Sequence, residues 1–197
     1  MLETRIESMS IDFLYELATF TLRKHSVNAI FTINYLNKKE WRKVAEEQVA
    51  IDDLVYNTRR EIQEMLGNGA NVNGDIAKKM SDSMDMERHT TAEYDRALNL
   101  EEQLNSTSII FNIKNKRITK VFKKTQPFMY KLYKKNKTKD FLILLNTYLL
   151  SSCPVEETYL SIAHETLHFV DTCFGNQLPY NDIEKKGKMI VAEFLSR

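Results

Sequence analysis

The sequence is poor in cysteine, proline and glycine, and it has no surplus of either charge. Its 197 residues include two cysteines, three prolines and five glycines, and the formal net charge is +1. A nearly neutral chain has no global attraction to nucleic acid or acidic lipid. If residues 154–173 form one helix, Cys153 and Cys173 lie about 30 Å apart, whereas a disulfide needs Cα atoms within about 7 Å. We therefore expect two free thiols, which fits a reducing compartment.

Long hydrophobic runs are absent too. The longest, Phe141 to Leu145, is far shorter than the roughly 20 residues that cross a bilayer as a helix. The first seven residues include acids where a signal peptide has basic residues and then an apolar run. We therefore expect no membrane association and a cytoplasmic or otherwise intracellular location.

The composition is that of a globular domain, with 43% hydrophobic and 28% charged residues. Residues 1–104 are predicted to form a helical region, because apolar side chains recur at helical spacing in 11–21, 38–66 and 75–104. Val27 to Leu36 fits a helix or a strand, and its neighbours favour a helix. Residues 67–74 hold three of the five glycines and are expected to be a mobile loop or a joint between domains.

The pattern changes in residues 105–197. β-Branched and aromatic residues at 108–113 and 117–122 predict a β-hairpin, and 141–146 predict a further strand. Helices are expected at 128–135, from Pro154 to a stop at Gly175, and at 182–195. The predicted fold class is α+β and mostly α-helical, with a small sheet that packs on the helix after Pro154 and on a C-terminal helix.

The chemistry centres on His164-Glu165-Thr166-Leu167-His168, an H-E-x-x-H motif inside the helix expected after Pro154. Residues four apart lie on the same face of a helix, so His164 and His168 can hold one metal ion between them. Glu165 can then reach a metal-bound water without being a ligand, which suits the general base of a zinc hydrolase. The alternative is a structural helix whose two histidines hydrogen-bond to neighbours, but leaving such groups buried and unpaired is costly.

The motif and its uncharged flanks resemble the active-site helix of the zincin metallopeptidases. The resemblance covers the last third of the chain. It implies a catalytic Zn²⁺ held by His164 and His168, with Glu165 as general base. It also implies a zincin-like sheet whose edge strand binds a peptide or protein substrate by strand addition.

A catalytic zinc needs a third protein ligand and an open position for water. No histidine follows His168, so the candidates are acidic. Asp171 shares the face of the motif and is expected to orient a metal-bound histidine. Glu193 lies among apolar residues, resembles the glutamate of the gluzincins and is the favoured ligand, with Glu184 as the alternative. Tyr180 is the candidate hydrogen-bond donor to the oxyanion.

The stretch 114–139 indicates a second kind of function, because it holds eleven Lys and Arg residues, no acid and several aromatic residues. Such a pattern suits an acidic protein or single-stranded nucleic acid as partner, and it also suits a solvated surface. The sequence therefore predicts a zinc-dependent metallopeptidase with a zinc-activated water and a glutamate base. The alternatives are a catalytically weak or inactive zincin-like protein for binding or assembly, and a nucleic-acid-binding module that uses 114–139.

Overall fold

The structure is a computed structural model that describes residues 10–67, 74, 76–80, 99–112, 119–175 and 180–197, without the side chains of 119, 180 and 181. The chain divides into two compact units. Unit 1 contains the described residues within 1–41, 105–112 and 135–197, and unit 2 contains those within 42–104 and 113–134. Both units are therefore discontinuous, and each draws on both halves of the sequence.

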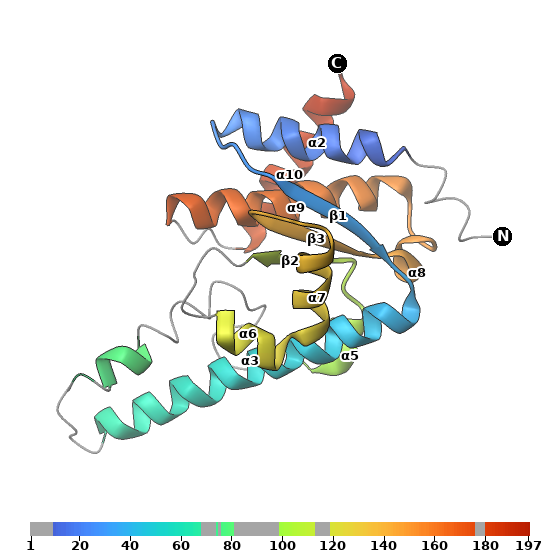
Figure 1. Cartoon of the computed structure of the whole chain (residues 1–197). Helices are drawn as coiled ribbons and strands as arrows, with labels where there is room; N and C mark the ends of the chain where they lie inside the picture. The colour runs from blue at the N-terminus through green and yellow to red at the C-terminus, as the bar shows by residue number, and fades with distance from the viewer. Residues whose placement is uncertain (1–9, 68–73, 75, 81–98, 113–118, 176–179) are drawn as a thin grey trace. The chain divides into compact units, whose positions relative to one another are not determined.

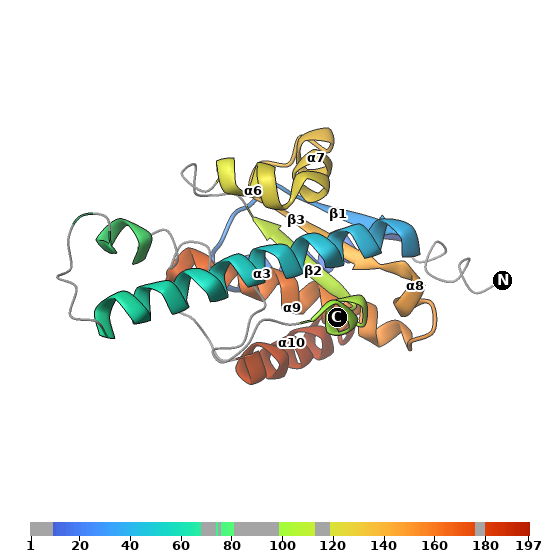
Figure 2. The same cartoon turned by 90° about the horizontal axis from the view of Figure 1, so that it is seen from below.

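Unit 1 contains a mixed three-stranded sheet. Its strands are β1 (Phe31–Leu36), β2 (Ser108–Asn112) and β3 (Phe141–Asn146), and they lie side by side in the order β1-β3-β2 (Figure 2). β3 pairs parallel to β1, with Ile143 opposite Ile33, and antiparallel to β2, with Ile143 opposite Ile110. β3 is buried along its whole length, as a central strand must be. β2 is an edge strand of this sheet.

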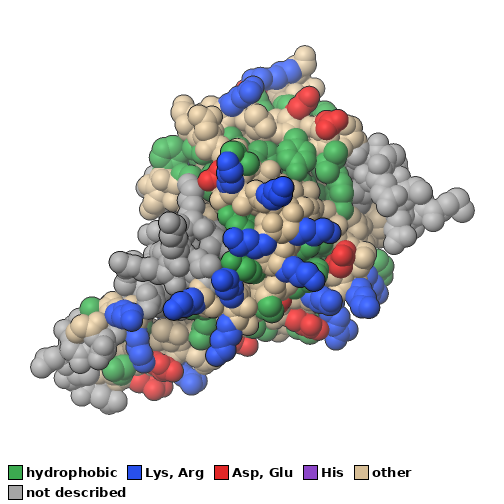
Figure 3. All heavy atoms as spheres, viewed as in Figure 1, with side chains coloured by type: hydrophobic (Ala, Val, Ile, Leu, Met, Phe, Trp, Pro, Cys, Tyr) green, Lys and Arg blue, Asp and Glu red, His purple; other side chains and the backbone are tan. Residues whose placement is uncertain are grey.

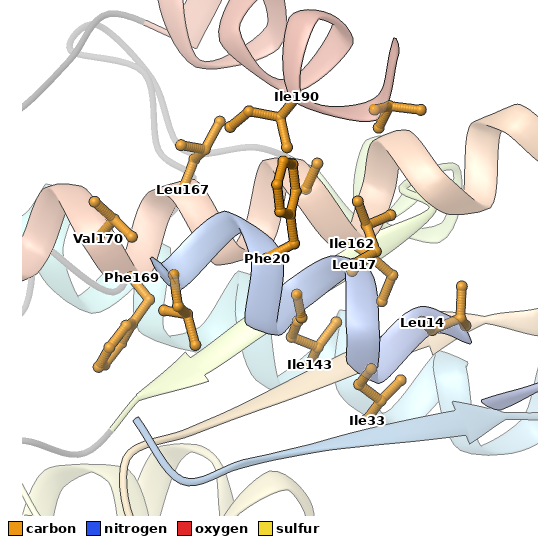
Figure 4. Close-up of a cluster of buried hydrophobic side chains, with 14 of the residues drawn as sticks. Leu14, Leu17, Phe20, Ile33, Ile143, Ile162, Leu167, Phe169, Val170 and Ile190 are labelled. Carbon is orange, nitrogen blue, oxygen red and sulfur yellow. The ribbon is translucent and has the colours of Figure 1, made fainter. Parts of the chain in front are cut away.

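Three helices of unit 1 gather on one side of this sheet (Figure 1). They are α2 (Ile11–Lys24), α9 (Val155–Phe174) and α10 (Tyr180–Leu195), and the short α8 (Thr147–Leu150) follows β3. Apolar side chains from α2, α9, α10, β1 and β3 meet in one core (Figure 4). Pro154 precedes α9, and Gly175 ends it in the left-handed conformation that glycine adopts without strain. α9 therefore lies at the centre of unit 1, where it contacts the sheet, α2 and α10.

Unit 2 contains most of α3 (Lys38–Gly67), together with α5 (Leu100–Leu104), α6 (Thr119–Thr125) and α7 (Pro127–Lys135). Its interior is partly polar. The carboxylate of Asp52 on α3 accepts hydrogen bonds from the buried amides of Gln48 and Gln103. Glu47, one turn earlier, accepts the backbone N–H groups of Phe128 at 2.5 Å and Met129 at 2.9 Å. A side chain of α3 thus caps the N-terminus of α7.

The predicted fold class is confirmed, because the chain is mostly helical and has one small mixed sheet. The helices expected at 38–66, 128–135, 154–175 and 182–195 are present, and Cys153 and Cys173 form no disulfide. Of the stretch 75–104, residues 76–80 and α5 are helical, while the rest of it and most of the glycine-rich loop lie outside the described residues. In the part of the chain that is described, no helix is long and apolar enough to cross a membrane.

Two of the secondary-structure predictions are wrong. Residues 31–36 form strand β1 and not a helix, because they pair along their whole length with β3. The second strand expected at 117–122 is absent from the described residues 119–122, which begin helix α6. In that helix Phe122 is fully buried while Lys120, Lys123 and Lys124 are exposed. In a strand, residues 120, 122 and 124 would lie on the same face, whereas a helix places Phe122 on the face opposite the lysines.

Candidate metal site on helix α9

The two histidines of the motif converge on one point. They lie four residues apart on α9, so their side chains project from the same face one turn apart. The Nε2 atoms of His164 and His168 are 2.9 Å apart, and the two rings meet edge to face with centroids 4.6 Å apart. Two lone pairs at this distance repel, so a proton or a cation has to lie between them.

The environment of His168 favours its neutral form. Burial lowers the pKa of His168, and the nearby His164 lowers it further, while the carboxylates of Glu165 and Asp171 act in the opposite direction. A neutral imidazole is the form that binds a metal ion. Asp171 is thus close enough to His168 to act on it electrostatically, and its role in orienting this histidine stays a prediction.

Glu165 occupies a different side of α9 and is held by the sheet. Its side chain is buried, and its Oε1 accepts a hydrogen bond of 2.7 Å from Ser108 Oγ at the start of β2. One turn earlier on α9, Ser161 donates a hydrogen bond to Thr107 Oγ1, just before β2. Two side chains of α9 therefore anchor the beginning of the edge strand and fix the direction of the Glu165 carboxylate.

Helix α10 crosses α9 close to the first histidine. A Cβ atom added at Gly187 would lie 3.8 Å from the backbone nitrogen of His164 and 3.9 Å from Cβ of Ala163. Glu184 is three residues before Gly187, so the two share a face of α10. The pKa of Glu184 is lowered, chiefly by a hydrogen bond of 2.5 Å from Lys188 and to a smaller extent by His164. Glu184 is therefore within electrostatic range of the motif, with its carboxylate turned to Lys188.

Glu193 lies elsewhere on α10. Its carboxylate forms ion pairs with Lys24 of α2 and with Arg197, and its side chain is 45% exposed. The hydrogen bond from Lys24 is the main reason that the pKa of Glu193 is lowered. Glu184 and Glu193 are nine residues apart, which separates them by about 13 Å along the helix axis. From these positions, at most one of the two carboxylates can bind the metal ion.

Tyr180 begins α10, but its side chain lies outside the described part of the structure. The proposed role of Tyr180 in oxyanion binding therefore stays a prediction.

The donor set fits a zinc ion in part. Two nitrogens bound to one tetrahedral zinc at about 2.05 Å lie about 3.3 Å apart, close to the separation of the two Nε2 atoms. Among the described residues, however, no three His, Cys, Asp or Glu side chains are grouped so as to hold a metal ion. His164 and His168 could supply two of the ligands. The nearby third candidate, Glu184, would have to leave Lys188 to join them.

Two contributors to the site were missed in the sequence. The sequence marks Ser108 only as the start of a strand, and no local pattern links it to a glutamate 57 residues later. Gly187 did leave a signal, because glycine inside a helix costs about 1 kcal/mol relative to alanine and often marks a close approach of two backbones.

Comparison of the chain with protein-family models, with curated proteins and with solved structures found no match.

Proposed function

We propose that the chain is a zinc-dependent metallopeptidase whose active site is built on α9. The observation that supports this most strongly is the convergence of the His164 and His168 Nε2 atoms beside a buried glutamate that a hydrogen bond holds in place. Two convergent imidazoles favour zinc over magnesium or calcium, which prefer oxygen ligands. The expected cofactor is therefore Zn²⁺, and the expected substrate is a peptide or protein.

Each residue of the motif has a separate task in this proposal. Zinc, when bound, lowers the pKa of its water and polarises a substrate carbonyl. His164 and His168, both in their neutral forms, hold the ion. Glu165 takes the proton of the attacking water, and its hydrogen bond from Ser108 keeps the carboxylate in one orientation. A base that is fixed before the reaction has no reorientation to make during it.

Strand β2 supplies the proposed substrate-binding element. It is an edge strand, it contacts α9, and its first residue binds the proposed base. An extended peptide that pairs with such an edge receives main-chain hydrogen bonds in register. The pairing would bring a peptide bond to the end of the strand at which Ser108 meets Glu165.

For the third ligand we favour Glu184 over Glu193. Glu184 already interacts electrostatically with His164, and its ion pair with Lys188 is exposed and thus weak. Glu193 is engaged by Lys24 and Arg197 and lies about 13 Å further along α10. A rotation of the Glu184 side chain away from Lys188 would complete three protein ligands.

The metal content of the full chain tests the binding half of the proposal. Elemental mass spectrometry should find about one zinc per chain, and His164→Ala should abolish it. His25→Ala is the matched control, because His25 is a half-buried histidine of the same unit that ends α2. No zinc in the wild type after zinc is supplied, or equal loss in both variants, would show that the motif does not form a metal site.

Hydrolysis of a mixed peptide library, followed by mass spectrometry, tests the catalytic half. Glu165→Gln should retain zinc and lose cleavage by at least about 100-fold, the lower range for a general base. The incomplete ligand set of the described residues favours one competing function, a zincin-like protein that binds without cleaving. Zinc binding with no cleavage of any peptide by the wild type would establish that second function.

A further inference from the structure

The basic stretch that forms α6 and α7 contains a short internal repeat. Residues 120–125 read K-V-F-K-K-T and residues 131–136 read K-L-Y-K-K-N, eleven positions apart. The first copy lies on α6 and the second lies at the end of α7. Each copy carries lysines at positions i, i+3 and i+4, which fall on one face of a helix.

In both copies the aromatic residue points away from the lysines. Phe122 is fully buried and Tyr133 is half-buried, whereas Lys120, Lys123, Lys124, Lys131 and Lys134 are exposed. We call these five residues the lysine surface. No acidic residue occurs between positions 119 and 139. Within the described part of the chain, none of the five lysines forms an ion pair with a carboxylate.

A tyrosine links the two copies. The ammonium groups of Lys123 on α6 and Lys134 on α7 lie 5.3 Å and 5.9 Å from the centroid of the Tyr130 ring. Lysines from both helices therefore share one aromatic ring, so the two repeats present their charges on the same surface. Figure 3 shows Lys and Arg side chains gathered on the face that carries α6 and α7, with few acids among them.

Beside the lysine surface, unit 2 has a shallow hollow of about 290 Å³ between α3 and the α6–α7 segment. Lys43 and Lys124 line it, and Lys43 lies 5.2 Å from the ring centroid of Phe128. The two acids of the hollow are already engaged. Glu46 pairs with Arg42, and the carboxylate of Glu47 accepts backbone N–H groups of α7. The hollow thus extends the positive surface and adds a second aromatic ring.

The composition of this surface distinguishes among anionic partners. Protein interfaces are depleted in lysine at their centre, and a membrane-surface site needs large apolar side chains to insert. None of the large exposed apolar residues of the described chain lies on α6 or α7. Unpaired lysines with aromatic rings among them are the features of proteins that bind single strands, in which cations contact phosphates and rings stack on bases.

We propose that unit 2 binds single-stranded nucleic acid, without sequence preference, through the lysine surface. Phosphates would contact the lysines of the two repeats, and Tyr130 would stack on a base once Lys123 or Lys134 turns from its ring to a phosphate. The recognition is electrostatic, so it depends strongly on salt. This proposal does not rest on the metal site in unit 1.

Fluorescence anisotropy of labelled 20-nucleotide RNA and DNA, with the full chain at 0.05 to 0.3 M salt, tests the proposal. The test variant is Lys123→Gln/Lys124→Gln/Lys131→Gln, because glutamine has a helix propensity similar to that of lysine. The charge-matched control is Lys78→Gln/Lys185→Gln/Lys186→Gln, which removes three exposed lysines elsewhere. Each phosphate contact contributes about 0.7 to the salt slope of single-strand binding, so the test variant should lose about 2 units of slope and about 100-fold in affinity at 0.1 M salt.

The control should bind within about twofold of the wild type, and the corresponding triple arginine variant should retain binding, since it keeps the charges. A variant Tyr130→Ala should weaken single-strand binding several-fold. Equal losses in the test and control variants would show that net charge alone is responsible and would overturn the assignment. Tighter binding of a duplex of equal length would refute the single-strand preference. If the test variant loses binding to an anionic vesicle or to polyglutamate but keeps its binding to the single strand, the surface serves another partner.

Discussion

The assignment of the third metal ligand can be tested with two variants of one helix, Glu184→Gln and Glu193→Gln. Both carboxylates lie on α10, about 13 Å apart along its axis, while a zinc–oxygen bond is only about 2.1 Å long. At most one of them can reach the point on which His164 and His168 converge. Loss of a group that only supports a ligand costs about 10- to 100-fold in metal affinity, so loss of the ligand itself should cost at least about 100-fold.

We therefore expect Glu184→Gln to weaken zinc binding at least about 100-fold and Glu193→Gln to leave it within about twofold. Competition against a zinc-binding dye at fixed pH measures both. Lys188→Gln provides a third comparison, because it frees Glu184 from its ion pair and should strengthen zinc binding by no more than about fivefold. If Glu193→Gln loses zinc and Glu184→Gln keeps it, Glu193 is the third ligand, as the sequence predicts, and α10 must move when zinc binds. Full retention in both would place the third ligand elsewhere.

Four further expectations follow from single residues. Ser108→Ala should lower kcat about tenfold with zinc content unchanged, because it frees the buried Glu165 carboxylate, and recovery in Ser108→Thr would assign the effect to the hydroxyl. Glu47→Ala should lower the free energy of unfolding by about 2 kcal/mol in urea titrations, because it leaves two N–H groups of α7 without their acceptor. Burial raises the pKa of Glu47 against the opposing effect of the two backbone hydrogen bonds, so the folded state binds the proton more tightly than the unfolded state. The stability of the wild type relative to Glu47→Gln should therefore fall as the pH rises above the ordinary pKa of a glutamate, about 4.3. Gly187→Ala should raise the free energy of unfolding by about 0.5 to 1 kcal/mol, since the new methyl group meets only ordinary contacts, and a lower melting temperature would mean that α10 and α9 cross more closely than described.

Helix α9 illustrates what the sequence predicts well. Its start after Pro154, its stop at Gly175 and the common face of His164 and His168 all depend on residues within a few turns of one another. Helical geometry converts such local spacing directly into position. The convergence of the two histidines was therefore predictable without knowledge of the rest of the chain.

Strand β1 and helix α6 illustrate what local patterns leave undecided. The segment 31–36 is short and apolar, so periodicity alone fits a helix or a strand. Pairing with β3, more than 100 residues later, decides for the strand. Valine and phenylalanine at 121 and 122 suggested a strand by composition, but burial of Phe122 with lysines on the other face stabilises a helix. In both cases tertiary contacts outweigh intrinsic propensity.

The candidate third ligand shows the same limit within the site. The sequence favours Glu193 because a carboxylate among apolar residues needs a partner. The structure supplies a partner in Lys24, which lies 169 positions away and on another helix. Which carboxylate of α10 faces the histidines depends on where α10 crosses α9, and Gly187 is the residue of α10 that lies beside the backbone of His164 at this crossing. Gly187 is thus the sequence feature that hints at the position of Glu184 near His164, because a glycine inside a helix is often found where another element packs against it.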